Sequence, residues 1–150
     1  MDQTLNLKLQ EFEKALTTLK EALDLFDIDN ILVRDATIKR FEYSYELCWK
    51  TSKVYLKEQR GDLVIAPKEC FRALGKHGIL APKEVEIALN MVDDRNETTH
   101  AYGERFIRAL YPRIKEYFAL MNKILSSTKK DWHIHAVDKT AKGFYNSPPT

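Results

Sequence analysis

The clearest pattern in the chain is a seam of apolar residues near its N-terminus, spaced alternately four and three positions apart. This spacing places the whole seam on one face of an α-helix and predicts a first amphipathic helix. Asp27, Asp29 and Asn30 follow and supply the side chains that turns and helix N-caps prefer. The members of the seam are Leu5, Leu9, Phe12, Leu16, Leu19, Leu23 and Phe26.

A second helix is expected from about Ile31 to Arg60, because Gly61 suits the position just past a helix C-terminus. It carries apolar residues on two faces. A helix of this kind is either central in a bundle or buried against a second subunit, and of these two interpretations we favour a homodimer. The main stripe is Ile38, Phe41, Tyr45, Cys48/Trp49, Ser52 and Tyr55/Leu56; the other line is Tyr43, Leu47 and Val54.

Three further helices are predicted. A short one follows Pro67 and ends at Lys76–Gly78, where basic residues precede a glycine. Pro82 suits the first turn of a fourth helix, and a fifth follows Gly103 with an expected kink at Pro112. The predicted core faces are Cys70, Phe71 and Leu74; Val85, Ala88, Leu89 and Val92; and Phe106, Ile107, Leu110, Ile114, Tyr117, Phe118, Met121 and Leu125.

The expected architecture is all-α: an up-and-down bundle of four to five antiparallel helices forming one domain over residues 1–125. Residues 126–150 have no evident amphipathic period and are expected to form a tail, either flexible or folded over a partner. The chain has only 5 Gly and 5 Pro in 150 residues. A sandwich or barrel would need a turn signal every 8 to about 12 residues, so the scarcity disfavours one.

Composition and charge exclude several classes of protein. The 24 basic and 22 acidic residues give a net charge of +2, too balanced for a protein that binds duplexes through bulk charge, though compatible with local handling of RNA. Cys48 and Cys70 lie on apolar stripes and are expected to be reduced thiols. The N-terminus lacks the features of a secretory signal, and no apolar run reaches the roughly 18 residues of a membrane span. A cytoplasmic protein without membrane contact is therefore expected.

The candidate chemistry lies where the core stripe of the fourth helix turns polar. Gly103 is expected to mark the end of this helix, just beyond His100. Extending the helix from Val92 by about 100° per residue places the following polar side chains on or beside the core-facing line. Asn96 and Thr99 fall on that line, Arg95 and Tyr102 on one flank, and His100 on the other.

These residue types suit phosphate chemistry. Arginine presents a planar donor fork to phosphate, and histidine titrates near neutral pH, as a general acid or base must. Asn96 precedes His100 by one turn and is placed to orient it or hold a phosphate oxygen. The structural alternative is an ion-pair network in which Asp93, Asp94 or Glu97 pairs with Arg95 or His100. An unpaired buried polar group costs ~1–3 kcal/mol, so polar side chains are not expected on a core-facing line merely to fill space. Taken together, these residues favour a groove that opens between the helices at this point.

Two blocks of sequence resemble a known family. Arg95-Asn96-x-x-x-His100-x-Tyr102 resembles the R-x4-6-H signature of HEPN domains, in the R-x4-H-x-Y form of small toxins encoded beside minimal nucleotidyltransferase antitoxins. Residues 40–50, RFEYSYELCWK, resemble the R-F-E-x-x-x-E-L-x-W-K block of the branch known as nucleotidyltransferase substrate-binding proteins. The similarity extends from about Leu5 to Leu125, with both blocks in the expected order.

The resemblance implies a homodimeric bundle acting as a metal-independent RNase, with the motifs of both subunits close together and no cofactor. His100 would assist attack by the ribose 2′-hydroxyl or protonate the leaving oxygen, Arg95 would hold the phosphate, and Asn96 would support the site. Tyr102 would accept AMP from the nucleotidyltransferase antitoxin, which would block RNA binding. Glu46 has the spacing of a surface ion pair with Lys50, although it is also a candidate to orient Arg95.

Two other functions stay open. The first alternative is a non-catalytic subunit that presents a nucleotide or substrate to the transferase, using the same groove residues. The second is a plain dimeric bundle whose polar cluster is structural. No metal site is expected, because the H-x-H pair His133 and His135 has no cysteine or carboxylate cluster nearby.

Overall fold

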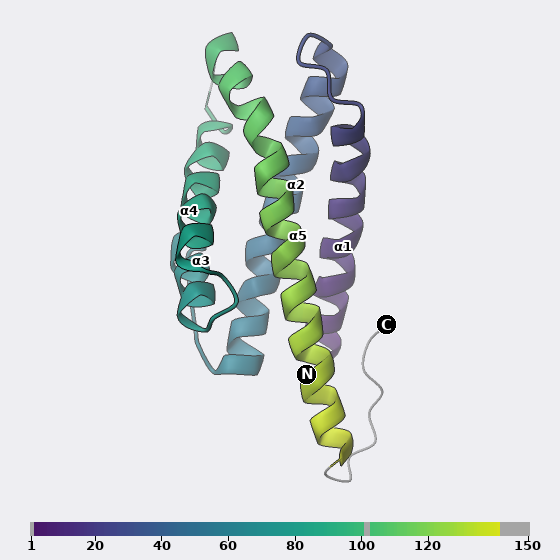
Figure 1. Cartoon of the computed structure of the whole chain (residues 1–150), viewed down its shortest axis with the longest axis vertical. Helices are drawn as coiled ribbons and strands as arrows, with labels where there is room; N and C mark the ends of the chain where they lie inside the picture. Colours follow the sequence, from purple (N-terminus) through teal and green to yellow (C-terminus); the bar gives the residue numbers. More distant parts are fainter. Residues whose placement is uncertain (1, 101–102, 142–150) are drawn as a thin grey trace.

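The amphipathic stripes form the inner faces of five α-helices in the computed structural model of the protein (Figure 1). The structure describes residues 2–100 and 103–141, with side chains described for 4–100 and 103–132. All secondary structure in these ranges is helical, which confirms the predicted all-α class. The helices are α1 (Asp2–Asp24), α2 (Ile31–Arg60), α3 (Pro67–Lys76), α4 (Pro82–Glu97) and α5 (Glu104–Ala141).

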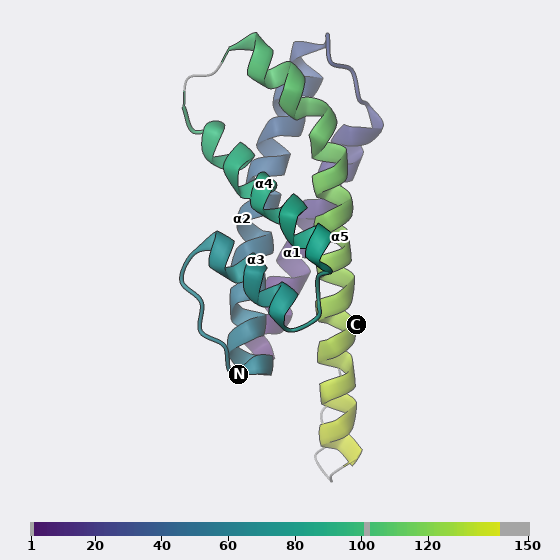
Figure 2. The same cartoon turned by 60° about the vertical axis from the view of Figure 1, so that its left-hand side comes forward.

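The long helices run side by side in alternating directions, and this arrangement confirms the up-and-down bundle (Figures 1 and 2). Helix α2 contacts α1, α3 and α5, while α5 contacts α1, α2 and α4. The short α3 lies within the connection between α2 and α4. The first turns of α2 and of α5 lie at the same end of the bundle (Figure 1).

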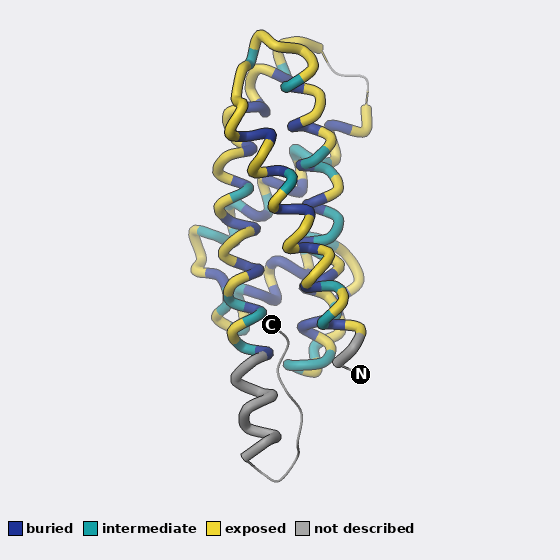
Figure 3. The backbone as a smooth tube through the Cα atoms, turned by 90° about the vertical axis from the view of Figure 1, so that its right-hand side faces the viewer, coloured by how far each residue is buried: buried dark blue, intermediate teal, exposed yellow. Residues whose placement is uncertain are grey.

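The core lies along the sides of the helices that face one another (Figure 3). The first six members of the α1 seam are buried, whereas Phe26 lies beyond the end of α1 and is 40% exposed. Aromatic rings join the middle of the bundle: Phe41 of α2 stacks on Tyr117 of α5 at 5.7 Å between ring centroids, and Tyr45 contacts Phe71 of α3. Burial of such apolar area is the main stabilising contribution to a bundle of this kind.

Helix α2 has the bounds expected from the sequence, because both ends are capped. The Asn30 side chain accepts hydrogen bonds from the backbone N–H groups of Leu32 and Val33, at 3.1 and 3.2 Å. Gly61 ends the helix in the left-handed conformation, with φ of 63°. The second apolar line of α2 packs partly against the core through Leu47 and Val54, in keeping with a central helix.

Helix α5 corrects the expectation of a tail from residue 126, because it continues as a helix to Ala141. Thr128 and Trp132 are buried, so the inner face of α5 extends beyond Leu125 at a helical spacing. Polar residues on that face interrupt the apolar period by which the sequence would indicate a helix. Asp131, for example, accepts a 2.5 Å hydrogen bond from the Tyr55 hydroxyl and pairs with Arg60 at 3.1 Å. Residues 142–150 of the expected tail lie outside the described residues.

Pro112 lies inside α5 without ending it. Its missing N–H removes one helical hydrogen bond, and the first turns of α5 run obliquely to the rest of the helix (Figure 2). Among the helices that the structure describes, none combines the length and apolar character required to cross a membrane.

Candidate functional site

The predicted site lies at the carboxyl end of α4, which ends earlier than expected. The last helical residue is Glu97, so His100 lies in a turn beyond the helix and not within it. The Thr98 and Thr99 hydroxyls each donate a 2.7 Å hydrogen bond to the backbone carbonyl three residues before, on Arg95 and Asn96. Such local side-chain bonds compete with the helical pattern, and they account for the early end.

The shorter helix changes which side chains face the core. Asn96, Thr99 and His100 are exposed, and Thr98 is buried instead. The expected placement of Asn96 and Thr99 on the core-facing line is therefore wrong. Asn96 is exposed although it lies within α4, and Thr99 lies beyond Glu97, where the helical rotation has stopped. The site is an exposed helix end and not a polar continuation of the core.

Arg95 is the most enclosed of the predicted site residues that the structure describes. Its side chain is 19% exposed and its Nη1 donates a 3.2 Å hydrogen bond to Thr98 Oγ1. The same Nη1 lies 3.7 Å from Glu42 Oε2 on α2. The Arg95 Nε is buried and makes no hydrogen bond within the described part of the protein. Arg95 is therefore held by one ion pair and one hydrogen bond, while its enclosed Nε has no partner among the described residues.

Glu42, and not Glu46, is the carboxylate that contacts Arg95. Glu46 lies 3.5 Å from Lys50 Nζ and accepts a 3.3 Å hydrogen bond from Trp49 Nε1, in keeping with the ordinary surface pair. Glu42 precedes Glu46 by one helical turn and is only 20% exposed. Glu42 belongs to the RFE segment of residues 40–42. This sequence block was the feature from which its contact with Arg95 could have been suspected.

Tyr45 lies near Arg95 and Glu46 and is buried. Burial raises the pKa of its hydroxyl, the charge of Glu46 adds to the rise, and the charge of Arg95 opposes it. The Tyr45 hydroxyl is therefore neutral at physiological pH. It has no hydrogen-bond partner among the described residues, so two buried polar groups, Tyr45 Oη and Arg95 Nε, are unsatisfied in this region.

The acidic neighbours on α4 pair with other helices. Asp93 lies 2.8 Å from Lys68 Nζ on α3. Asp94 accepts two 2.9 Å hydrogen bonds from the Arg113 guanidinium and one from the Tyr117 hydroxyl, both on α5. Burial and the bond to Asp94 raise the pKa of Tyr117, so its hydroxyl stays protonated and donates.

This Asp94 network fixes the last turn of α4 against α5, immediately beside Arg95. Two parallel bonds between a guanidinium and a carboxylate define the relative orientation of the groups that carry them. The network therefore sets where Arg95 and the following turn lie. Sequence reasoning considered Asp94 only as a partner of Arg95 or His100 and missed this role.

The remaining predictions about the site are untested. Tyr102 lies outside the described residues, as do the side chains of His133 and His135. Within the side chains that are described, no three His, Cys, Asp or Glu residues converge as a metal site would require. The described site thus brings together a partly neutralised guanidinium, an exposed amide and an exposed imidazole at one helix end.

Comparisons with known proteins give the family of the chain. Residues 7–130 match the family described as nucleotidyltransferase substrate binding protein like. A crystal structure of a protein from Thermus thermophilus is 42% identical, with a TM-score of 0.74, and the match covers 78% of this chain and 98% of that one. No curated protein matches. The chain therefore belongs to the nucleotidyltransferase substrate-binding-protein-like family.

Proposed function

We propose that this chain is the helical partner subunit of a nucleotidyltransferase and that its α4 site cleaves RNA without a metal ion. The observation that carries the proposal is the placement of Arg95 and His100 at one helix end. Arg95 is held partly buried with an unsatisfied Nε, and His100 is exposed to solvent. Family membership supports the nucleotidyltransferase partner.

In the proposed reaction the ribose 2′-oxygen attacks the adjacent phosphorus and the bond from phosphorus to the 5′-oxygen breaks. The products are a 2′,3′-cyclic phosphate and a 5′-hydroxyl. His100 removes the 2′-hydroxyl proton or protonates the leaving 5′-oxygen. Arg95 stabilises the charge that develops on the phosphate oxygens, and Asn96 donates a hydrogen bond to one of them.

The proposal includes a homodimer and control by the transferase. One chain supplies one imidazole, whereas proton removal and proton donation occur on opposite sides of the phosphorus. A second copy with its α4 end nearby supplies the other group. Transfer of AMP to Tyr102, seven residues after Arg95, places an anion beside the guanidinium and excludes the RNA phosphate. The pair would then act as toxin and antitoxin.

The test is to express the chain alone as wild type, His100→Ala and Asn90→Ala. Asn90 is an exposed residue of α4 away from the site and serves as the matched control. Wild type and Asn90→Ala are expected to arrest growth and cleave RNA, while His100→Ala does neither and has an unchanged circular dichroism spectrum. If the wild type neither harms cells nor cleaves RNA, the nuclease proposal is wrong.

A second candidate is a non-catalytic subunit that presents a nucleotide or substrate to the transferase. The contact between Arg95 and Glu42 favours it, because a paired guanidinium suits reversible phosphate binding. This function predicts that Arg95→Ala slows transfer by the partner nucleotidyltransferase, while the wild type cleaves no RNA. If Arg95→Ala and His100→Ala leave every activity unchanged, the polar cluster is structural.

A further inference from the structure

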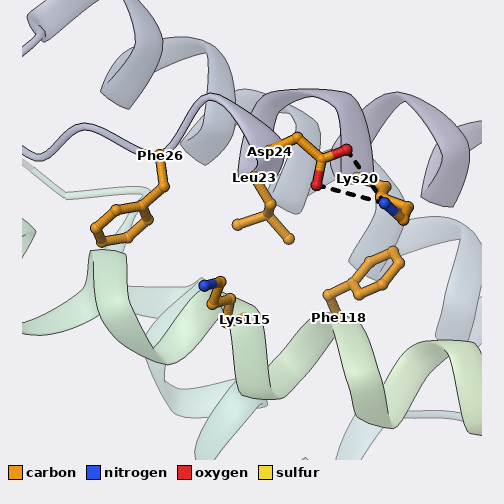
Figure 4. A pocket seen from close by; sticks show the side chains of 6 residues that line it. All are labelled: Lys20, Leu23, Asp24, Phe26, Lys115 and Phe118. Atoms are coloured by element: carbon orange, nitrogen blue, oxygen red, sulfur yellow. Dashed lines mark hydrogen bonds and ion pairs between the residues drawn. The ribbon is translucent and has the colours of Figure 1, made fainter.

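A cavity lies between the end of α1 and α5, and none of the residues of the α4 site lines it. It has a volume of about 360 Å³, within the range of about 300–1,000 Å³ that small-ligand sites occupy. Phe26 and Phe118 stand on opposite sides of the opening, with Leu23 and Lys115 between them (Figure 4). Lys20 and Asp24 complete the lining.

The charges of the lining leave one cation available to a ligand. Lys20 Nζ lies 3.1 Å from Asp24 Oδ2, so these two charges neutralise each other (Figure 4). Lys115 forms no ion pair with any carboxylate in the described part of the chain; its ammonium lies over the ring of Phe26 at 5.6 Å. Such an exposed cation–π contact contributes only about 0.5–1 kcal/mol. An anionic ligand group is therefore a stronger partner for Lys115 than the ring.

Phe26 is held in place while its ring stays partly open to solvent. Its backbone N–H donates a 3.1 Å hydrogen bond to the Leu23 carbonyl, and the next N–H, of Asp27, donates to the Tyr111 hydroxyl at 3.1 Å. One face of the ring stacks on buried Tyr111, with centroids 4.4 Å apart and an interplanar angle of 10°. The ring is nevertheless 40% exposed. A large apolar ring fixed at a cavity edge is a prepared surface for stacking.

We propose that this cavity binds a nucleotide, with the base stacked on Phe26 and the phosphate held by Lys115. A ligand with both a flat ring and an anion gives each member of the weak contact between Lys115 and Phe26 a better partner. The ammonium moves to the phosphate and the ring face opens to the base, as in other sites that combine stacking with a cation. Phe118 and Leu23 cover the other side of the base. The proposal rests on the cavity alone and does not require that the α4 site cleaves RNA.

The experiment is a calorimetric titration of the full-length protein with AMP, with adenosine and inorganic phosphate as partial probes. AMP is expected to bind the wild type at least fivefold more tightly than adenosine, because only AMP engages Lys115. Lys115→Glu is expected to lower the affinity for AMP at least tenfold. Lys130→Glu makes the same change of charge at an exposed position of α5 outside the cavity and should leave binding unchanged.

Two variants test the ring and separate the two sites. Phe26→Ala can disturb the packing on Tyr111, so Phe26→Leu, which keeps the bulk but lacks the flat face, is measured beside it; both are expected to lose affinity at least fivefold. Arg95→Ala is expected to bind AMP normally while it loses RNA cleavage, whereas Lys115→Glu keeps cleavage. No AMP binding at millimolar concentration, equal binding of AMP and adenosine, or loss of AMP binding in Arg95→Ala would each overturn the proposal.

Discussion

Arg95 and Glu42 hold opposite charges in a partly enclosed position between α4 and α2. The distance of 3.7 Å and the exposure of about a fifth of each side chain describe a pair that is neither fully solvated nor fully buried. Its attraction is therefore stronger than that of an open surface pair and weaker than that of a core pair. The same carboxylate lowers the positive potential that Arg95 presents to a phosphate.

Removal of the Glu42 charge is expected to strengthen RNA binding. In a His100→Ala background that cannot cleave, Glu42→Gln should raise affinity for a short single-stranded RNA several-fold and steepen its dependence on salt, because Arg95 then lacks its counter-ion. Fluorescence anisotropy measures both effects. Glu46→Gln, one turn along α2, is the matched control and should change affinity less. Unchanged or weaker RNA binding in Glu42→Gln would contradict this expectation.

Glu84 connects the start of α4 to α5 and makes stability depend on pH. Its bond with Lys123, and then the 2.8 Å bond from the Ala81 N–H, hold the pKa of its carboxyl below the usual value of 4.5. The folded pKa is thus lower than the unfolded one. The stabilisation is complete above the unfolded value and is lost as pH falls through the folded value.

Glu84→Gln keeps an acceptor for the Ala81 N–H but removes the charge. We expect it to lower the free energy of unfolding by about 0.5–1 kcal/mol at pH 7. The difference from the wild type should vanish as the pH falls well below 4.5. Urea unfolding from pH 3 to pH 7 measures this. A difference that stays constant across this range would show that the charge is not involved.

The sequence alone could identify Arg95, Asn96 and His100 as a candidate cluster but not their partners. A carboxylate on a bundle helix has several cations within reach of its flexible side chain. Which of them it pairs with depends on how the packed helices are rotated and shifted along their axes. Asp94 illustrates the point, because it pairs with Arg113, 19 positions away. The pairing of Arg95 with Glu42 required the same packing information.

At the level of elements, α3 and α4 approach closely at Gly75. A β-carbon added there would lie 2.6 Å from Val85 Cγ2, nearer than non-bonded carbon atoms approach. The glycine is therefore required by packing, although alanine would favour the helix itself by about 1 kcal/mol. The short α3 depends on this contact for its position against α4.

Gly75→Ala is expected to destabilise the protein by about 1–3 kcal/mol through overpacking. Val85→Ala removes the methyl group that clashes, so the double variant should be more stable than the sum of the single effects predicts. Chemical denaturation of the four proteins gives the coupling directly. Strictly additive effects would mean that the two residues do not meet in solution.

Prediction of the elements succeeded where strong local signals agreed with the packing. Asn30 and Gly61 define α2 because each end has its own capping chemistry. The predicted end of α4 lies too far along the chain. The Thr98 and Thr99 hydroxyls donate hydrogen bonds to backbone carbonyls of the last helical turn, and the helix ends there. The last part of α5 was not predicted because Thr128 and Asp131 are polar and lie on its inner face. A helix is recognised from the sequence by apolar residues at those positions.

At the scale of the whole molecule, α5 contacts α1, α2 and α4 and so joins both halves of the chain. Its last described turns extend past the ends of the other helices (Figure 1). Before that extension, Trp132 is buried and Asp131 satisfies the buried Tyr55 hydroxyl. The segment after Leu125 is therefore part of the stabilising structure.

A chain that ends after Leu125 is expected to have a free energy of unfolding at least about 3 kcal/mol lower than that of a chain that ends after Ala141. It loses the buried Trp132 side chain and leaves the Tyr55 hydroxyl without its partner. Guanidinium unfolding of both chains and the full-length protein tests this, and the chain ending after Ala141 controls for loss of the final residues. Equal stability of the two shortened chains would exclude a structural role for residues 126–141.

The position of α5 also has a consequence during synthesis. Translation adds residues at about 5–20 per second, so the 38 residues of α5 require roughly 2 to 8 s. Throughout that interval α1, α2 and α4 exist without the helix that all of them contact. Their apolar faces are then exposed on the nascent chain, which makes this interval the one in which a chaperone, or a second chain being made nearby, has most to bind.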